Sequence, residues 1–197
     1  MRRARKRSLR RCRPNTLHVR LWAALLLTLF SALLHAQSAK PTEYEVKAAY
    51  LYNFGKFVRW PEGAAAGSAN TFFICVIGKD PFGKSLDATL EGASWKGKPV
   101  IAKRITSVDQ AADCQVLFIP ASEAEQWSQL QPTLQKLPIL TVSDAPRFAR
   151  RAGMIEFLLS ENRVRFEVNL EAAEKAGLSL SSQLLKVAIR VRRTGEH

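Results

Sequence analysis

Short apolar runs alternate with segments of helical apolar spacing from residue 42 almost to the end of the chain. The runs predict strands, and they cover residues 71–77, 99–105, 115–119, 139–142, 154–159 and 163–168. The segments of helical spacing cover residues 42–60, 80–90, 122–136, 169–177 and 179–193. Strands interleaved with helices, together with one hairpin at 160–162, predict an α/β sandwich. We expect a single domain whose mixed sheet of about six strands is flanked by helices.

Cap signals place the ends of these helices. Capping boxes, in which a Ser or Thr and a Glu three residues later bond to backbone amides of the first turn, are predicted at Thr42 with Glu45 and at Ser122 with Glu125. The other signals are Trp60 before Pro61 as a helix end, Asp80 as an N-cap with Pro81 in the first turn, Asn169 as an N-cap, and Gly177 as a stop.

The same spacing indicates which side chains face inward. The first helix is expected to bury Val46, Tyr50, Phe54, Phe57 and Val58, and the last helix Leu180, Leu184, Val187, Ala188 and Val191. The last helix would carry arginines at its C-terminus, where positive charge suits the helix dipole. In the strand 163–168, apolar residues alternate with Arg163, Arg165 and Glu167, which predicts one solvent-exposed face.

The first 36 residues have the composition of a secretory signal. Residues 1–20 hold nine basic residues and no acidic one, and residues 21–34 form an uncharged apolar run. The run is short for a bilayer span, which needs about 20 residues, so a membrane anchor is the less favoured alternative. We expect residues 1–36 to be a signal peptide cleaved near Ala36, with Ala39 as the second choice, leaving a domain of residues 37–197 with its core in 42–193.

Removing this segment changes the apparent charge of the protein. The whole chain has a net charge of +13, but residues 37–197 keep 21 basic and 17 acidic residues, a net charge of +4. A nucleic-acid-binding domain would concentrate basic residues on one face of a strongly basic domain. We therefore expect no nucleic-acid partner.

Cysteine and histidine usage excludes several classes of enzyme. After cleavage, Cys75 and Cys114 form an even pair in an oxidising compartment, so we predict that they are bonded. His197 is the only histidine that remains. Serine and cysteine hydrolases need an imidazole base, and zinc sites usually need His or Cys. The sequence thus predicts no catalytic residues, no metal and no cofactor.

One motif favours a different class, a nucleotide-binding enzyme. Residues 78–85 (GKDPFGKS) match the phosphate-binding loop pattern and lie between a strand and a helix. Lys84 and Ser85 would then contact phosphate and magnesium. However, Pro81 has no amide to donate, and a secreted domain would rarely meet a nucleoside triphosphate. We interpret the segment as an ordinary strand-to-helix turn.

Several segments, read together, resemble the YfiR family of periplasmic regulators. They are residues 45–61 (EVKAAYLYNFGKFVRWP), 75–83 (CVIGKDPFG), 114–120 (CQVLFIP), 139–148 (ILTVSDAPRF) and 162–183 (NRVRFEVNLEAAEKAGLSLSSQ). The resemblance covers nearly all of residues 42–193. Relatives can carry a second cysteine pair around residues 148–157, and this chain has none there.

The resemblance implies a non-catalytic inhibitor. Such a protein binds the periplasmic sensor region of an inner-membrane diguanylate cyclase and keeps the enzyme inactive, which lowers cyclic di-GMP and biofilm formation. An outer-membrane, peptidoglycan-binding lipoprotein sequesters the inhibitor. The resemblance also implies a homodimer and a bridge between Cys75 and Cys114. By position, it assigns partner control to Glu167 and Ile155.

Aromatic and arginine side chains usually supply most of the binding energy at protein interfaces. The candidates for partner contact are therefore Arg59, Trp60, Arg165 and Phe166, in addition to Glu167 and Ile155. A periplasmic small-ligand sensor remains an alternative, because the carboxyl ends of strands in such sheets form crevices.

Overall fold

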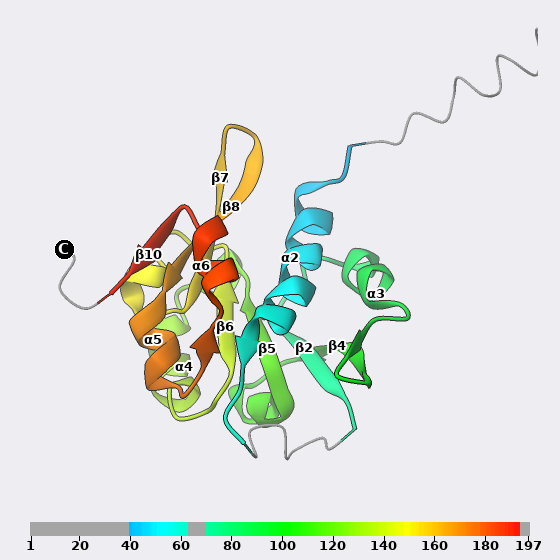
Figure 1. Cartoon of the computed structure of the whole chain (residues 1–197), viewed down its shortest axis with the longest axis horizontal. Helices are drawn as coiled ribbons and strands as arrows, with labels where there is room; N and C mark the ends of the chain where they lie inside the picture. Colours follow the sequence, from blue (N-terminus) through cyan, green and yellow to red (C-terminus); the bar gives the residue numbers. More distant parts are fainter. Residues whose placement is uncertain (1–39, 63–69, 194–197) are drawn as a thin grey trace, which may run out of the picture. The chain divides into compact units, whose positions relative to one another are not determined.

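The computed structural model describes residues 40–62 and 70–193 (Figure 1). The predicted signal peptide and its cleavage site lie outside the described residues. Contacts within the chain group Pro41–His197 into one compact unit. Within the described residues, no helix is both long and apolar enough to cross a bilayer.

The centre of the unit is a mixed sheet with more strands than the sequence predicted. It has eight strands in the order β10-β8-β7-β6-β5-β2-β4-β3. The strands are β2 (Phe72–Ile77), β3 (Ser94–Trp95), β4 (Lys98–Ile105), β5 (Cys114–Ile119), β6 (Leu140–Ser143), β7 (Ile155–Ser160), β8 (Arg163–Asn169) and β10 (Arg190–Arg192). The central strands pair in parallel, whereas β7 pairs antiparallel with β8 and β3 with β4. A separate two-stranded sheet joins β1 (Val58–Arg59) to β9 (Ser179–Leu180).

Helices cover both faces of the large sheet, as the α/β sandwich prediction requires. The helices α2 (Glu43–Phe57), α3 (Lys84–Leu90), α5 (Leu170–Lys175) and α6 (Ser182–Val187) contribute to one apolar cluster. A second cluster contains side chains from α4 (Trp127–Leu134) and the 3₁₀ helix η1 (Val108–Asp113). Two further 3₁₀ turns are η2 (Ala121–Glu123) and η3 (Ala149–Arg151). The nearly continuous burial of β5 and β6 follows from this double cover.

Local signals at several boundaries are confirmed. Thr42 and Glu45 form the predicted capping box of α2, and Asn169 caps α5 by accepting a hydrogen bond from the amide of Ala172. The hairpin between β7 and β8 turns through Glu161 and Asn162, which both have positive φ, the conformation that tight two-residue hairpins require. The predicted bond between Cys75 and Cys114 is present and joins β2 to β5.

The first helix ends earlier than predicted, and its buried face is rotated. It stops at Phe57 because the next two residues pair with β9. Its buried residues are Lys47, Ala48, Leu51, Phe54 and Gly55. Of the predicted inward set, Phe54 and Val58 are buried, whereas Val46, Tyr50 and Phe57 are only partly covered.

Two other helix starts were predicted wrongly. Asp80 accepts a hydrogen bond from the amide of Phe82 in a tight turn, and α3 begins only at Lys84. The capping box at Ser122 does not form, because Ser122 lies inside the 3₁₀ turn η2 and α4 begins only at Trp127.

The predicted last helix is also wrong beyond Val187. The chain leaves α6 there and forms β10, which pairs in parallel with β8. Leu180 and Leu184 are buried as expected, but Val187 is 63% exposed. Arg190 and Arg192 therefore lie on an edge strand and not at a helix C-terminus. This strand explains the unexpected environment of Glu167 described below.

Candidate functional site

The six candidate contact residues fall in two separate places. Ile155, Arg165, Phe166 and Glu167 lie on the β7–β8 hairpin, whereas Arg59 and Trp60 follow α2. Ile155 and Phe166 are buried in the core, and Arg165 is half-buried. Of Ile155, Arg165 and Phe166, only Arg165 offers a sizeable exposed surface on the hairpin.

Arg59 and Trp60 belong to the neighbourhood of the small sheet. Arg59 is exposed on β1, opposite Ser179. The ring of Trp60 packs edge-to-face against Phe72 and Trp95, so it is half-buried in an aromatic cluster. Its indole nitrogen is buried without a hydrogen-bond partner among the described residues. This position makes Trp60 chiefly a packing residue, with Arg59 exposed beside it.

Glu167 holds the C-terminal strand against the sheet. Its side chain does not point into solvent, as the alternation had predicted, because β10 lies beside it and the residue is only 6% exposed. Its carboxylate accepts hydrogen bonds from Arg192 Nε and Nη2, the latter at 2.8 Å, and forms an ion pair with Arg190 at 3.0 Å. A buried carboxylate with two guanidinium partners fixes the register of this short strand.

Glu167→Gln is expected to loosen β10 without unfolding the domain. The amide keeps one acceptor but loses the charge that both arginines share, a cost of about 1–3 kcal/mol. Hydrogen exchange at Arg190–Arg192 should accelerate while exchange in β5 stays unchanged. Glu161→Gln, at the exposed hairpin turn, is the matched control and should have no effect. Unchanged protection of β10 in Glu167→Gln would contradict the assignment.

An apolar groove lies between α2, β8 and α6. It has a volume of about 430 Å³, and its lining includes Phe54, Phe57, Phe166, Leu184 and Val187. Phe166 forms its floor in edge-to-face contact with Tyr50 and Phe54. The exposed Val187 extends the apolar surface at its rim, and Ile189, 52% exposed, follows two residues later. Exposed apolar side chains beside a groove are typical of a binding surface.

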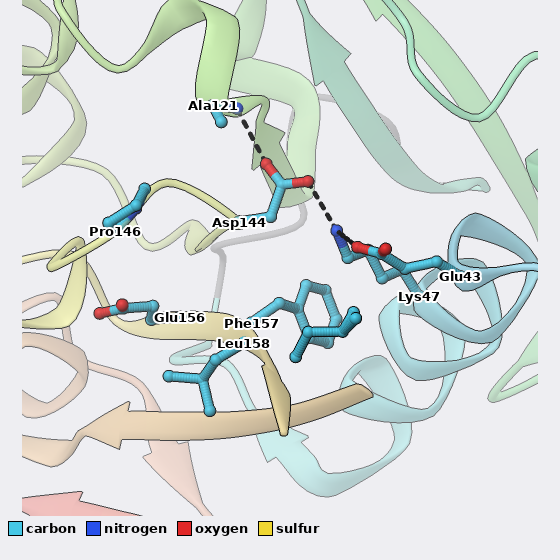
Figure 2. Close-up of a pocket in the computed structure, with 9 residues that line it drawn as sticks. Glu43, Lys47, Ala121, Asp144, Pro146, Glu156, Phe157 and Leu158 are labelled. Atoms are coloured by element: carbon cyan, nitrogen blue, oxygen red, sulfur yellow. Dashed lines mark hydrogen bonds and ion pairs between the residues drawn. The ribbon is translucent and has the colours of Figure 1, made fainter. Parts of the chain in front are cut away.

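A second hollow, of about 350 Å³, has charged walls (Figure 2). Lys47 on α2 is only 3% exposed. Its ammonium pairs with Glu43 and, at 2.7 Å, with Asp144, which directly follows β6. Asp144 also accepts hydrogen bonds from the amide of Ala121 at 2.8 Å and from the hydroxyl of Tyr44 at 3.0 Å. Figure 2 shows this carboxylate between Ala121 and Lys47.

The partners of these charges favour a structural role. Glu156, on the same hollow, accepts hydrogen bonds from the amides of Arg147 and Ala149. The buried polar groups thus bind one another, tying α2 to the loops after β5 and β6. A small-ligand sensor would need a site at the carboxyl ends of parallel strands, and the hollow lies there. However, the charged side chains that line the hollow already have partners.

The Tyr44 hydroxyl reports on this cluster. Burial first, and then the charge and hydrogen bond of Asp144, raise the pKa of Tyr44 to about 12. The unfolded chain would lose this proton near pH 10, so folding stability is expected to fall as the pH rises from about 10 to about 12. Absorbance titration of the phenolates should show one late-titrating tyrosine that Tyr44→Phe removes. A wild-type titration with no phenol delayed beyond pH 11 would contradict this expectation.

The segment 78–85 does not have the geometry of a phosphate-binding loop. The carboxylate of Glu123 lies against Gly78 and accepts from the amide of Lys79. The amide of Phe82 is bound to Asp80, and Asp80 and Asp87 both pair with Arg104. Amides that would have to hold phosphate are therefore used internally, beside an acidic group that would repel it. Among the residues that the structure describes, no cluster of His, Cys, Asp and Glu could hold a metal ion.

Sequence reasoning missed Lys47, Asp144 and the arginine partners of Glu167. Lys47 interrupts the buried face of α2 four residues after Glu43, and Asp144 directly follows the fully buried strand β6. A charged residue at such positions is the signal that could have found the first two. The Glu167 partners lie more than 20 residues away in sequence, at a separation of 25 for Arg192, and no local pattern joins them.

These features define a small α/β domain with an exposed apolar groove and with buried charged clusters that hold its elements together. A family model described as YfiR/HmsC-like matches residues 44–189. The chain belongs to this family.

Similar solved structures are remote. One is the ABC domain in complex with L-Trp from Streptococcus pneumonia, with 10% identity, a TM-score of 0.49 and coverage of 72% of this chain and 60% of that one. Another is a conserved domain protein from Vibrio cholerae, with 12% identity, a TM-score of 0.48 and coverage of 78% and 62%. The chain thus spans about three fifths of the length of each of these two structures.

Proposed function

We propose that this protein is a periplasmic, non-catalytic inhibitor of an inner-membrane diguanylate cyclase. It binds the periplasmic sensor region of the cyclase and thereby lowers cyclic di-GMP and biofilm formation. The observation that carries the proposal is the family match over residues 44–189. The exposed apolar groove is consistent with this role, because an inhibitor of this kind acts through a binding surface.

The proposed contact surface is the groove between α2, β8 and α6. Val187 and Ile189 supply exposed apolar area at its rim, Phe166 forms its floor, and Arg165 lies on the same hairpin. Ile155 and Glu167 act indirectly, the first by packing the hairpin and the second by holding β10. The backbone links the rim of the groove to its floor, since the amide of Ile189 donates a hydrogen bond to the carbonyl of Phe166 at 3.0 Å.

Inhibition requires preferential binding to one state of the sensor. Moving a two-state sensor from almost fully active to almost fully inactive needs about 5 kcal/mol of differential affinity. A groove lined by several aromatic side chains can supply energy on this scale if the inactive sensor fills it with apolar anchors. Arg59 and Trp60 form a second, smaller candidate contact near the end of α2.

Export and assembly complete the proposal. The chain is exported by a signal peptide cleaved near Ala36 and works as a homodimer. An outer-membrane lipoprotein that binds peptidoglycan sequesters it and so releases the cyclase. Capture of the protein from detergent-solubilised membranes of its own host tests the first partner, because a membrane protein with a diguanylate cyclase domain should co-purify.

Val187→Glu is the sharpest test of the groove. A carboxylate forced into an apolar interface costs roughly 3 kcal/mol, or about 100-fold in affinity. Cyclic di-GMP in cells carrying this variant should rise to the level of a strain that lacks the protein. The fold should be unaffected, because Val187 is 63% exposed.

Ser128→Glu is the matched control. It adds the same charge at an exposed position of α4, which contributes to the other apolar cluster, and cyclic di-GMP should stay at the wild-type level. If Val187→Glu accumulates normally and cyclic di-GMP does not change, the groove is not the inhibitory surface.

A further inference from the structure

The outer edge of β4 is open over most of its length. The strand has eight residues, Lys98–Ile105. The next strand outward, β3, pairs only with Lys98 and Pro99, and the carbonyl of Ala93 extends this contact to the amide of Val100. Beyond Val100, no strand of the described part of the chain pairs with this edge.

Backbone alternation identifies the groups that face outward. The amide of Val100 points to the outer edge, towards Ala93, whereas the carbonyl of Ile105 points inward and accepts from Gly78 at 2.9 Å. Successive residues of a strand turn their amides and carbonyls to opposite edges. The N–H and C=O groups of Ala102 and Arg104 therefore face outward, available to an added strand.

A groove runs beside this edge. It has a volume of about 450 Å³ and lies between β4 and α3, the adjacent green elements in Figure 1. Its floor is apolar, with the buried Leu90 and Val100, and the half-buried Ala102 continues the same face of the strand. A segment paired with β4 would place alternate side chains in this groove, the arrangement by which peptides add to sheet edges.

The charged side chains around the outer edge of β4 indicate what kind of peptide segment would bind there. Arg104 is held by Asp80 and Asp87, and Lys103 pairs with Asp113. Among the described residues around the edge, the groups outside these ion pairs are Lys84, Lys96, Lys98 and Glu91, an excess of two positive charges. With the second carboxylate on Arg104 counted, the surroundings of the edge keep an excess of one positive charge. Exposed Lys84 and Glu91 line the groove itself, and Lys96 lies over the ring of Trp95 in the β3–β4 turn.

We propose that β4 binds an extended, net-acidic peptide segment of another protein as an added strand. Outward amides and carbonyls supply hydrogen bonds, the groove accepts alternate apolar side chains, and the lysines attract acidic ones. A second copy of this chain is a poorer occupant, because two basic edges would face each other. The inference goes beyond the proposed function and does not depend on it.

Peptide selection tests the proposal directly. Random phage-displayed peptides of about ten residues, roughly 33 Å when extended, are selected on the purified protein. Enriched sequences should be net acidic with alternating apolar residues. Ala102→Pro removes one outward amide and spares the pairing with β2, so affinity for the synthesised peptides should fall roughly tenfold. Ala102→Ser, which keeps the amide, should bind as the wild type does.

A second variant distinguishes a loss of peptide binding from a loss of folding. Lys84→Glu changes an exposed side chain and should also weaken the acidic peptides about tenfold, while melting temperature stays unchanged. Failure to enrich acidic peptides, or equal binding by both variants and the wild type, would overturn the proposal. A dimer detected by sedimentation would also overturn the proposal, if Ala102→Pro dissociates it and the peptides do not compete with its formation. These readouts involve no cyclic di-GMP, so they stand apart from the cyclase proposal.

Discussion

Replacing both Cys75 and Cys114 with alanine is expected to lower the free energy of unfolding by about 4 kcal/mol. The two residues are separated by 39 positions, and a crosslink across a loop of this length removes much conformational freedom from the unfolded chain. Both cysteines are buried. A loss of this size should lower the melting temperature by roughly 10 °C in a domain of this length.

Thermal melting with and without dithiothreitol checks this expectation. The wild-type protein should shift toward the double variant when it is reduced, whereas the double variant should not respond to the reductant. A double variant that melts within about 2 °C of the oxidised wild type would show that the bridge contributes little, since that difference is under about 1 kcal/mol.

Asp144→Ala is expected to lower the free energy of unfolding by about 3 kcal/mol, the lower end of the range for breaking a buried ion pair. The substitution removes one of the two carboxylates that pair with Lys47 and also leaves the Ala121 amide and the Tyr44 hydroxyl without that acceptor. Glu43 still pairs with Lys47, but its side chain is 41% exposed, so it compensates only in part.

Urea unfolding of a double-mutant cycle separates the pair from its neighbours. Adding Lys47→Met to Asp144→Ala removes the buried charge and should recover part of the loss. Asp109→Ala is the control, because that carboxylate is exposed and forms no ion pair within the described residues. A loss below 1 kcal/mol for Asp144→Ala would mean that water, rather than Asp144, solvates Lys47.

Local features of this fold could be predicted from sequence where the signal and its partner lie within a few residues. The Thr42 capping box, the Asn169 cap and the turn at Glu161 and Asn162 are of this kind. The α/β sandwich followed from the order of apolar runs. The predicted helix starts at Asp80 and Ser122 were wrong, because the chain forms a tight turn after Asp80 and a 3₁₀ turn through Ser122 before α3 and α4 begin.

The short pairings could not be predicted, because their stability comes from distant partners. Strand β10 has three residues, and its helical apolar spacing suited a continuation of α6 equally well. Its pairing with β8 and the two arginine contacts to Glu167 settle the conformation. For the same reason, the sequence predicted the hairpin that carries the candidate contact residues, but it did not predict the burial of Glu167 or the groove above Phe166.

Under the proposed export, the bridge between β2 and β5 also bears on how the chain reaches its compartment. A domain of ordinary stability, about 5–15 kcal/mol, would lose a large part of it if the cysteines stayed reduced. In a reducing cytosol the newly made chain would therefore spend more time unfolded, the state that passes through a secretion channel. Oxidation after crossing would then make folding effectively one-way, so that the protein becomes durable only where it is used.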